Sequence, residues 1–177
     1  MAQGDGGKSI FTGKEDRESF LPGLEWVCIS HGWRVHAWLW MGNHCHLLLE
    51  TPEANLSSGM RVLLGTYSQA WNSRQKRRGH VFRGRYKSVL VAGEWAEDVH
   101  YFKSVADYIH LNPAWAGLAE GNMGKLVDYL WSSLRYYPKG NPPEWQPMER
   151  VLDAFQLSHD RRGRVSCISW AGSEGGE

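Results

Sequence analysis

The sequence predicts an α+β fold in which helices cover a small antiparallel sheet. Two patterns support this prediction. Segments whose apolar residues recur at helical spacing alternate with strand-like segments, and a short turn separates two of the strand-like segments. A chain of 177 residues has room for one such domain and little room for a second.

The first helix and a hairpin follow in order. A helix is expected over residues 16–31, where apolar side chains recur at helical spacing and Gly32 acts as a stop. Residues 33–40 alternate in the manner of a strand, and residues 44–51 form a second strand. The turn at 41–43 is short, so we expect these two strands to pair as a hairpin.

A long helix and a third strand come next. Asn55 precedes an apolar stripe that predicts a helix over 55–78, with Asn55 as its N-cap. Residues 80–91 have the composition of another strand, interrupted at Gly84.

The last long helix is expected over 94–112, because apolar residues recur there at helical spacing and Pro113 would end the helix. Residues 125–137 and 147–157 are expected to be short helical or irregular pieces. The repeated change between helix and strand is what gives the α+β prediction.

The composition excludes several classes of protein. The chain has 20 Lys and Arg against 19 Asp and Glu, whereas a protein that held nucleic acid by bulk charge alone would be far more basic. No apolar stretch approaches the roughly 18–20 residues of a membrane span, and the start lacks the apolar core of a secretory signal. The three cysteines are widely spaced, which argues against a disulfide framework or a cysteine zinc site and favours a reducing cytoplasm.

Two histidines share one face of the second hairpin strand. Side chains on a strand alternate, so His44 and His46 point the same way and Cys45 points the other way. Two imidazoles in this arrangement can ligate one metal ion. The alternative is a pair of surface or hydrogen-bonded histidines, because two ligands alone complete no metal site.

Tyr108 and Asn112 lie one turn apart on one face of the helix expected over 94–112. The amide oxygen of Asn112 suits a hard divalent cation. Tyr101, seven residues earlier, shares this face. The alternatives are a half-buried core tyrosine and an asparagine that merely ends the helix before Pro113.

Residues 74–87 concentrate positive charge, with seven cations and no acid: Arg74, Lys76, Arg77, Arg78, Arg83, Arg85 and Lys87. The rest of the chain is therefore acidic, and the near-neutral total hides a segregated distribution. On a strand the last three cations share one face, and Phe82 and Tyr86 share the other. This pattern suits a sugar-phosphate backbone with unstacked bases, or it is a solvated edge strand whose charges prevent aggregation.

Taken together, the His pair, the basic segment and the Tyr-x-x-x-Asn helix come in the order found in one family. The chain resembles the HUH-type single-tyrosine (IS200-like) transposases, and most closely the REP-associated tyrosine transposases. The resemblance covers roughly residues 8–137, through IFTGKEDRESFL (10–21), HGWRVHAWLWMGNHCHLLLET (31–51), NLSSGMRVLLGTYSQAWN (55–72), GHVFRGRYKSVLV (79–91), YIHLNPAWAGL (108–118) and YLWSSLRYY (129–137).

The resemblance implies a ferredoxin-like antiparallel sheet backed by helices, and cleavage and rejoining of single-stranded DNA at hairpins. Tyr108 matches the nucleophile that forms a 5′-phosphotyrosine, and Tyr101, on the same helix face, is the rival nucleophile. His44, His46 and Asn112 match the ligands of Mg²⁺ or Mn²⁺. The partner is then single-stranded or hairpin DNA in the cytoplasm, at the nucleoid, with no membrane. The residues expected to bind DNA are Lys76, Arg77, Arg78, Arg83, Arg85 and Lys87.

The chain departs from the family pattern at its start. Residues 1–9 are polar and Gly-rich, so a disordered start is expected before a catalytic domain at 10–137 and a partly disordered C-terminal extension at 138–177. The family's first strand, central in the sheet beside the strand that carries the His pair, is thus expected to be missing. Either translation starts upstream of Met1, or the chain is a remnant, or another segment fills the gap. The remnant interpretation leads to a catalytically inactive binder of hairpin DNA, and a plain metal-binding domain is a further alternative.

The chain holds ten tryptophans. Those at the ends of elements, Trp33, Trp40 and Trp95, are the expected contacts for bases. Trp115 is expected either to pack or to face DNA. Packing in the core or on the sheet is expected for Trp26, Trp38, Trp71 and Trp131.

Overall fold

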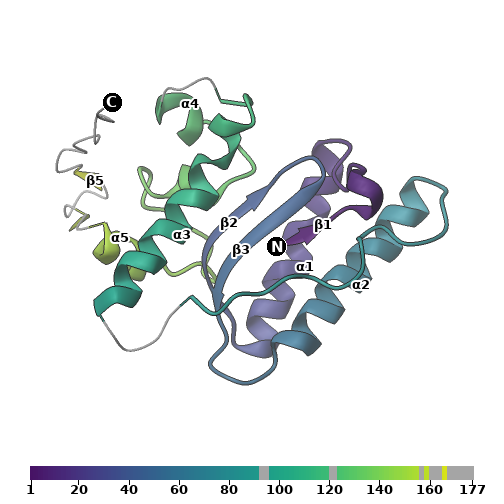
Figure 1. Ribbon diagram of the computed structural model, residues 1–177, viewed down its shortest axis with the longest axis horizontal. Helices are drawn as coiled ribbons and strands as arrows, with labels where there is room; N and C mark the ends of the chain where they lie inside the picture. The colour runs from purple at the N-terminus through teal and green to yellow at the C-terminus, as the bar shows by residue number, and fades with distance from the viewer. Residues whose placement is uncertain (92–95, 120–122, 156–157, 160–164, 167–177) are drawn as a thin grey trace.

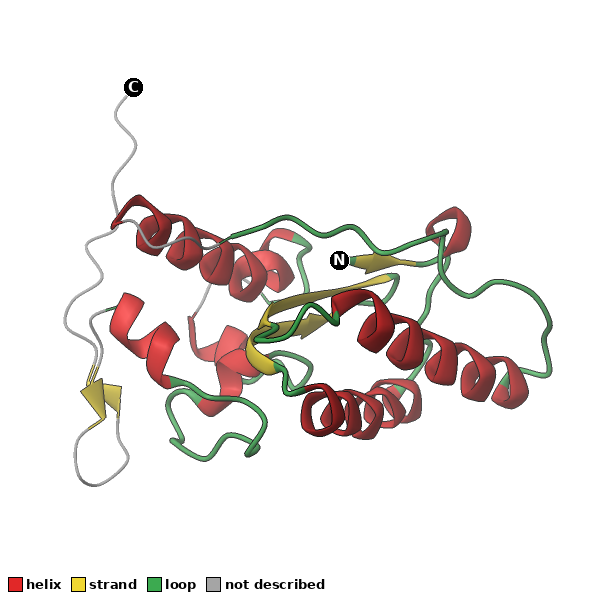
Figure 2. Ribbon diagram, turned by 90° about the horizontal axis from the view of Figure 1, so that it is seen from below, coloured by secondary structure: helices red, strands yellow, loops and turns green. Residues whose placement is uncertain are grey.

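The computed structural model describes residues 1–91, 96–119, 123–155, 158–159 and 165–166. The main sheet has three antiparallel strands in the order β1 (Ala2–Gln3), β3 (His44–Glu50) and β2 (Arg34–Trp40). Helices α1 (Lys14–His31) and α2 (Leu56–Arg74) cover one face of it. Helix α3 (Ala96–Trp115) covers the other face (Figure 1; Figure 2). The predicted α+β class, an antiparallel sheet backed by helices, is confirmed.

The predicted hairpin is present and carries both cores. In its register Trp40 pairs with Cys45 and Leu39 pairs with His46, and a bulge lies between Val35 and Ala37. The bulge adds a residue to β2, so the side chains on its two sides do not follow a simple alternation. Both faces of β2 are buried, because α1 and α2 cover one and α3 covers the other.

The two cores divide at the sheet. The first is built from aromatic and aliphatic side chains of α1 and α2 against Val35, Trp38 and Trp40. The second is smaller and packs α3 against Ala37 and Leu39. The sheet therefore separates a large apolar layer from a layer whose helix carries the predicted nucleophile.

The expectation of a missing first strand is corrected. Residues 2–3 form β1, with Ala2 paired to Cys45 and Gln3 paired to His44. The residues that follow are also held, because Gly4 N donates to Asn43 O at 2.8 Å and Ile10 is fully buried. Residues 1–9 thus take defined positions where disorder was expected. A two-residue polar strand has no side-chain periodicity, and backbone hydrogen bonds to the hairpin specify it instead.

The prediction of a regular strand over 80–91 is wrong. This segment runs beside β1, where Arg83 N donates to Gln3 O at 2.7 Å and Lys87 N donates to Met1 O at 2.9 Å, but a single bridge, Gly4 to Phe82, is formed. Gly84 has a φ of +64°, which lies in the left-handed region and breaks the pleat. The order across the sheet is therefore 81–87, β1, β3, β2, as in a ferredoxin-like fold, with its first and fourth strands reduced.

Three helix ends differ from expectation. Helix α2 stops at Arg74 instead of Arg78. Asn55 makes no capping hydrogen bond: its side chain accepts from Trp33 Nε1 and donates to His31 O, each at 2.8 Å, and so ties α2 to the end of α1. Helix α3 continues two residues beyond Pro113, which is buried within its last turn.

The C-terminal part adds short elements: α4 (Met123–Val127), η2 (Ser133–Tyr136), α5 (Glu149–Ala154), β4 (Ser158–His159) and β5 (Val165–Ser166). The segments that lead into η2 and α5 cover the outer edge of β2, because Trp40 N donates to Trp131 O at 2.8 Å and Trp38 Nε1 donates to Gln146 Oε1 at 2.8 Å. Among the residues that the structure describes, no helix is both long and apolar enough to cross a membrane.

Candidate functional site

The His pair lies on the face of β3 that α3 covers. The rings of His44 and His46 have centroids 4.9 Å apart and are nearly perpendicular. Cys45 between them is buried in the opposite core, as the alternation of a strand requires. The two imidazoles therefore form one side of a shared site.

Helix α3 supplies the other side. The ring of Tyr108 lies 5.5 Å from that of His46, centroid to centroid, and Tyr108 remains 46% exposed. One turn later, Asn112 lies near enough to His44 to influence the pKa of that imidazole. The structure thus brings together the four residues that the sequence singles out from two separate segments.

The register of α3 is fixed from its buried side. Phe102, Ala106 and Ile109 face the sheet in the second core. His110 is also buried, and its Nε2 is 2.8 Å from Ser133 Oγ, which in turn accepts the backbone N–H of Trp38 at 2.9 Å. Anchored in this way, the helix presents Tyr108 at the margin between core and solvent.

The rival nucleophile Tyr101 lies two turns earlier on α3 and is 47% exposed. Seven residues of helix correspond to about 10.5 Å along the axis, so its ring lies farther from the His pair. In the described part of the chain, the ring contact to His46 from α3 is made by Tyr108. The geometry therefore favours Tyr108 over Tyr101.

Both histidines are held in the neutral form that metal binding requires. Burial, assisted by the neighbouring His44, lowers the pKa of His46 to about 3. Burial also lowers the pKa of His44 from its ordinary value. At neutral pH each ring therefore offers a lone pair.

The donor set fits a divalent cation. His44 Nδ1 donates to Asn43 Oδ1 at 2.7 Å, the kind of bond that orients a metal-binding imidazole. His46 Nε2 is buried and has no hydrogen-bond partner among the described residues. No cluster of three or more His, Cys, Asp or Glu suited to a metal occurs in that part of the chain, so the third protein donor would be the amide of Asn112.

The six predicted DNA-binding residues are all exposed: Lys76, Arg77, Arg78, Arg83, Arg85 and Lys87. Three follow the end of α2, where Arg77 lies over the ring of Trp71 at 5.5 Å. The other three lie in the segment beside β1, so they line the sheet edge about two strand spacings, roughly 10 Å, from β3. Phe82 is buried and Tyr86 is half-buried, whereas these three cations are exposed.

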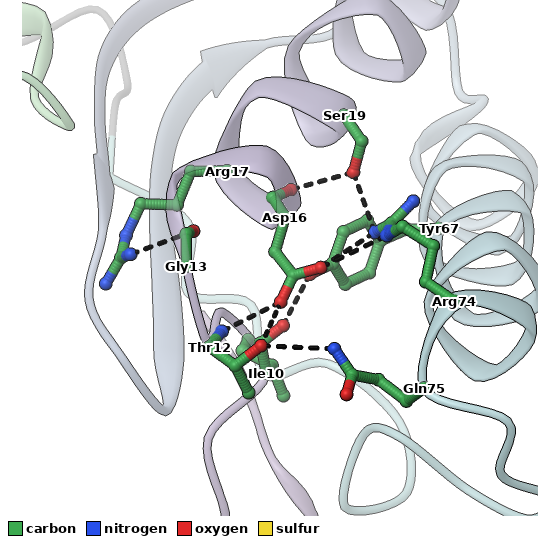
Figure 3. Close-up of polar contacts among 9 residues, drawn as sticks. All are labelled: Ile10, Thr12, Gly13, Asp16, Arg17, Ser19, Tyr67, Arg74 and Gln75. Atoms are coloured by element: carbon green, nitrogen blue, oxygen red, sulfur yellow. Dashed lines mark hydrogen bonds and ion pairs between the residues drawn. The ribbon is translucent and has the colours of Figure 1, made fainter.

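Arg74, the first cation of the basic segment, belongs to a different cluster. Its guanidinium donates to Asp16 Oδ1 from Nε at 3.2 Å and from Nη2 at 3.0 Å (Figure 3). Thr12 donates to Asp16 Oδ2 from its backbone N at 2.8 Å and from Oγ1 at 2.6 Å. Sequence reasoning missed this cluster, because its members are far apart in the chain and form no motif.

The sequence left open whether Trp115 packs against the protein or faces a ligand. It lies at the end of α3, is 65% exposed, and has its ring 5.6 Å from that of Tyr108. The signal that could have found it is the spacing of seven residues, which puts both side chains on one helix face.

Some of the other tryptophans differ from expectation. Trp33 and Trp40, expected to contact bases, are buried, whereas Trp26, expected in the core, is 56% exposed. Trp95 lies outside the described residues.

Comparison with known proteins decides the family. A family model described as "Transposase IS200 like" matches residues 7–112. This chain belongs to the IS200-like transposase family. A solved structure of a REP-associated tyrosine transposase bound to a REP hairpin has the same fold, with a TM-score of 0.62 and 15% sequence identity over 95% of this chain and 89% of that chain. No curated protein matches the chain.

The family match of this IS200-like transposase spans β3 and ends at Asn112. It therefore includes the His pair, the basic segment and Tyr108. Trp115 and the C-terminal elements lie beyond the matched residues.

Proposed function

We propose that this IS200-like transposase cleaves and rejoins single-stranded DNA at hairpins, in DNA transposition or REP-element mobility. Tyr108 is the nucleophile, and His44, His46 and Asn112 hold Mg²⁺ or Mn²⁺. The observation that carries the proposal is the meeting of Tyr108 with His46 at 5.5 Å, next to a buried imidazole nitrogen that has no hydrogen-bond partner in the described structure.

The residue types suit a transesterification. The Tyr108 hydroxyl attacks the scissile phosphorus, the Oη–P bond forms, and the P–O3′ bond breaks; the phenolic proton ends on the released 3′ oxygen. The product is a 5′-phosphotyrosine, and attack on it by another 3′-hydroxyl reverses these steps and joins strands without a nucleotide cofactor. A divalent cation at the His pair supplies charge neutralisation at the phosphate oxygens.

The chain's own residues orient this chemistry. The neutral imidazoles present lone pairs without adding positive charge, and Asn112, on the turn of α3 that follows Tyr108, lies beside His44 of β3. The exposed cations along residues 76–87 supply a track for the phosphate backbone. The hairpin bound to the similar transposase supports hairpin DNA as the partner. A DNA substrate in turn supports a cytoplasmic location at the nucleoid.

The alternative of an inactive hairpin binder depended on an empty position beside β3. Residues 2–3 lie there and pair with β3, which removes that argument. Nothing else in the described residues favours a silent binder or a plain metal-binding domain over the enzyme.

The test is a covalent-adduct assay. The protein is incubated with a hairpin oligonucleotide that carries single-stranded flanks and a 3′-end label, in Mg²⁺ or Mn²⁺. We expect a labelled protein–DNA adduct that Tyr108→Phe abolishes and that Tyr101→Phe, the matched control on the same helix face, retains. An adduct that survives Tyr108→Phe but not Tyr101→Phe would reassign the nucleophile, and binding without any adduct would favour the silent binder.

A further inference from the structure

The solvent side of α3 carries a row of aromatic rings. Tyr101, Tyr108 and Trp115 are spaced by seven residues, so they lie on one face of the helix. Their exposed fractions are 47%, 46% and 65%. Soluble proteins seldom line up large exposed apolar groups without a binding partner for them.

Trp115 is the most exposed ring of this row. Its centroid is 5.6 Å from that of Tyr108 and the planes are inclined by 50°, so the two rings touch while most of the indole faces solvent. A tryptophan that served packing alone would be covered, as Trp38 and Trp40 are in the first core. Trp115 thus lies directly beside the proposed nucleophile, with its indole ring accessible to a ligand.

The exposed indole of Trp115 is suited to one class of ligand at this position. Unpaired bases stack on aromatic side chains, and every base offers a π-face, so such contacts require no particular sequence. The exposed cations of residues 83–87 lie along the edge of the same sheet and supply the matching contacts for a phosphate backbone. A single-stranded nucleotide is therefore favoured over an apolar peptide.

We propose that Trp115 is the stacking platform for an unpaired base next to the phosphate that Tyr108 attacks. The inference rests on the proposed function and specifies its substrate: the scissile phosphate lies in a single-stranded flank whose adjacent base is unstacked from its neighbours. Trp115 is a positioning residue in this role, because it holds the base and touches no reacting atom.

The test places 2-aminopurine, a fluorescent adenine analogue quenched by stacking, at each flank position of the hairpin oligonucleotide in turn. Binding is measured with Tyr108→Phe protein, so that no covalent adduct forms. We expect quenching at one flank position, which Trp115→Ala abolishes together with a loss of affinity of about 5- to 150-fold. Trp115→Phe, which keeps a flat ring, should retain most of both.

Two controls separate stacking from damage to the fold. Trp26→Ala removes an indole that is 56% exposed on α1, away from the site, and should change neither quenching nor affinity. Trp115→Ala should leave the thermal unfolding midpoint unchanged, because the side chain is largely in solvent.

The outcomes distinguish this inference from the proposed function. Suppose that the Tyr108-dependent adduct forms, but that Trp115→Ala leaves both the 2-aminopurine quenching and the affinity for the oligonucleotide unchanged. The stacking platform is then overturned and the proposed function stands. If no adduct forms but the quench still depends on Trp115, the stacking site stands and the proposed function falls. If the protein binds no oligonucleotide, both are overturned.

Discussion

Two polar clusters in this molecule each hold a buried ionisable side chain beside a tyrosine, but they differ in whether its hydrogen bonds are satisfied. One joins Asp16 of α1 to Arg74 of α2, and the other joins His46 of β3 to Tyr108 of α3. Both ionisable side chains are buried, with exposures of 3% and 7%, and each has a tyrosine beside it. The carboxylate of Asp16 accepts four hydrogen bonds, whereas His46 Nε2 has no hydrogen-bond partner among the described residues.

The tyrosines differ in the same way. Tyr67 is buried and its hydroxyl donates to Ile10 O, so it is committed to the fold (Figure 3). Tyr108 stands half in solvent beside Trp115. A satisfied buried network stabilises the native state, and an unsatisfied one costs stability and is therefore a place to look for function. The comparison predicts that changes at Asp16 alter stability and changes at His46 alter ligand binding.

The largest expected effect on stability is at the Asp16 cluster. Asp16→Ala removes the acceptor of four hydrogen bonds and leaves the Arg74 guanidinium without its carboxylate partner, so we expect the free energy of unfolding to fall by about 3 kcal/mol. Urea unfolding followed by circular dichroism measures it. The matched control is Lys14→Ala, which breaks an exposed ion pair with Glu18 and should cost no more than about 0.5 kcal/mol. Equal losses in the two variants would show that the Asp16 network is not a stabilising unit.

The second prediction concerns metal binding at the His46 cluster. Adding Mn²⁺ should stabilise the protein, by about 2.7 kcal/mol at a concentration 100 times the Kd, because the ion binds the folded state. His46→Gln should remove most of this gain, while His80→Gln, which replaces an exposed histidine, should keep it. A chelator should reverse the gain in the unsubstituted protein. Stabilisation that survives His46→Gln would place the cation elsewhere.

The parts predicted correctly from sequence are those with a local pattern. The hairpin and the apolar faces of α1, α2 and α3 follow from periodicity, and the His pair shares a face because strand side chains alternate. Tyr108 lies at the margin of the core, half exposed, as its face of α3 predicts.

The parts that could not be predicted are set by contacts across the chain. Residues 2–3 become a strand through backbone bonds to β3, and 81–87 fails to become one because Gly84 takes a left-handed conformation. Asp16 and Arg74 meet through the packing of α1 on α2, which no spacing in the sequence reveals. Burial of Trp33 and Trp40 likewise depends on which elements cover the hairpin.

The third prediction uses pH to separate the two sides of the sheet. Burial lowers the pKa of His110 to about 4, so below pH 6.5 the unfolded chain takes up a proton that the folded chain refuses. Its contribution to stability is therefore present above pH 6.5 and is lost as the pH falls toward 4, by roughly 1 kcal/mol per pH unit. His46 acts in the same direction.

The contribution of the Asp16 cluster to stability should not change between pH 7 and 4.5. Burial would raise the pKa of Asp16, but the hydrogen bonds from Thr12 and Arg74 outweigh it and hold the pKa below its ordinary value. Its stability is thus lost only below about pH 3.8. Unfolding measured from pH 7 to 4.5 should show a slope that His110→Asn flattens, whereas Asp16→Asn lowers the whole curve without changing its slope. A slope unaffected by His110→Asn would mean that another group titrates.

The smallest expected effect compares two cations of the same basic segment. Arg85 is exposed beside β1, and Arg74 is engaged by Asp16. If residues 76–87 track a single strand, Arg85→Ala should flatten the dependence of log affinity on log salt by about 0.7, since one phosphate contact is lost. Arg74→Ala, measured well below its unfolding midpoint, should leave that slope unchanged, because its guanidinium already neutralises a carboxylate and displaces no counterion from DNA. Fluorescence anisotropy with a labelled hairpin across a salt series gives both slopes, and a flattening in Arg74→Ala equal to that in Arg85→Ala would show that the Asp16 cluster opens to bind DNA.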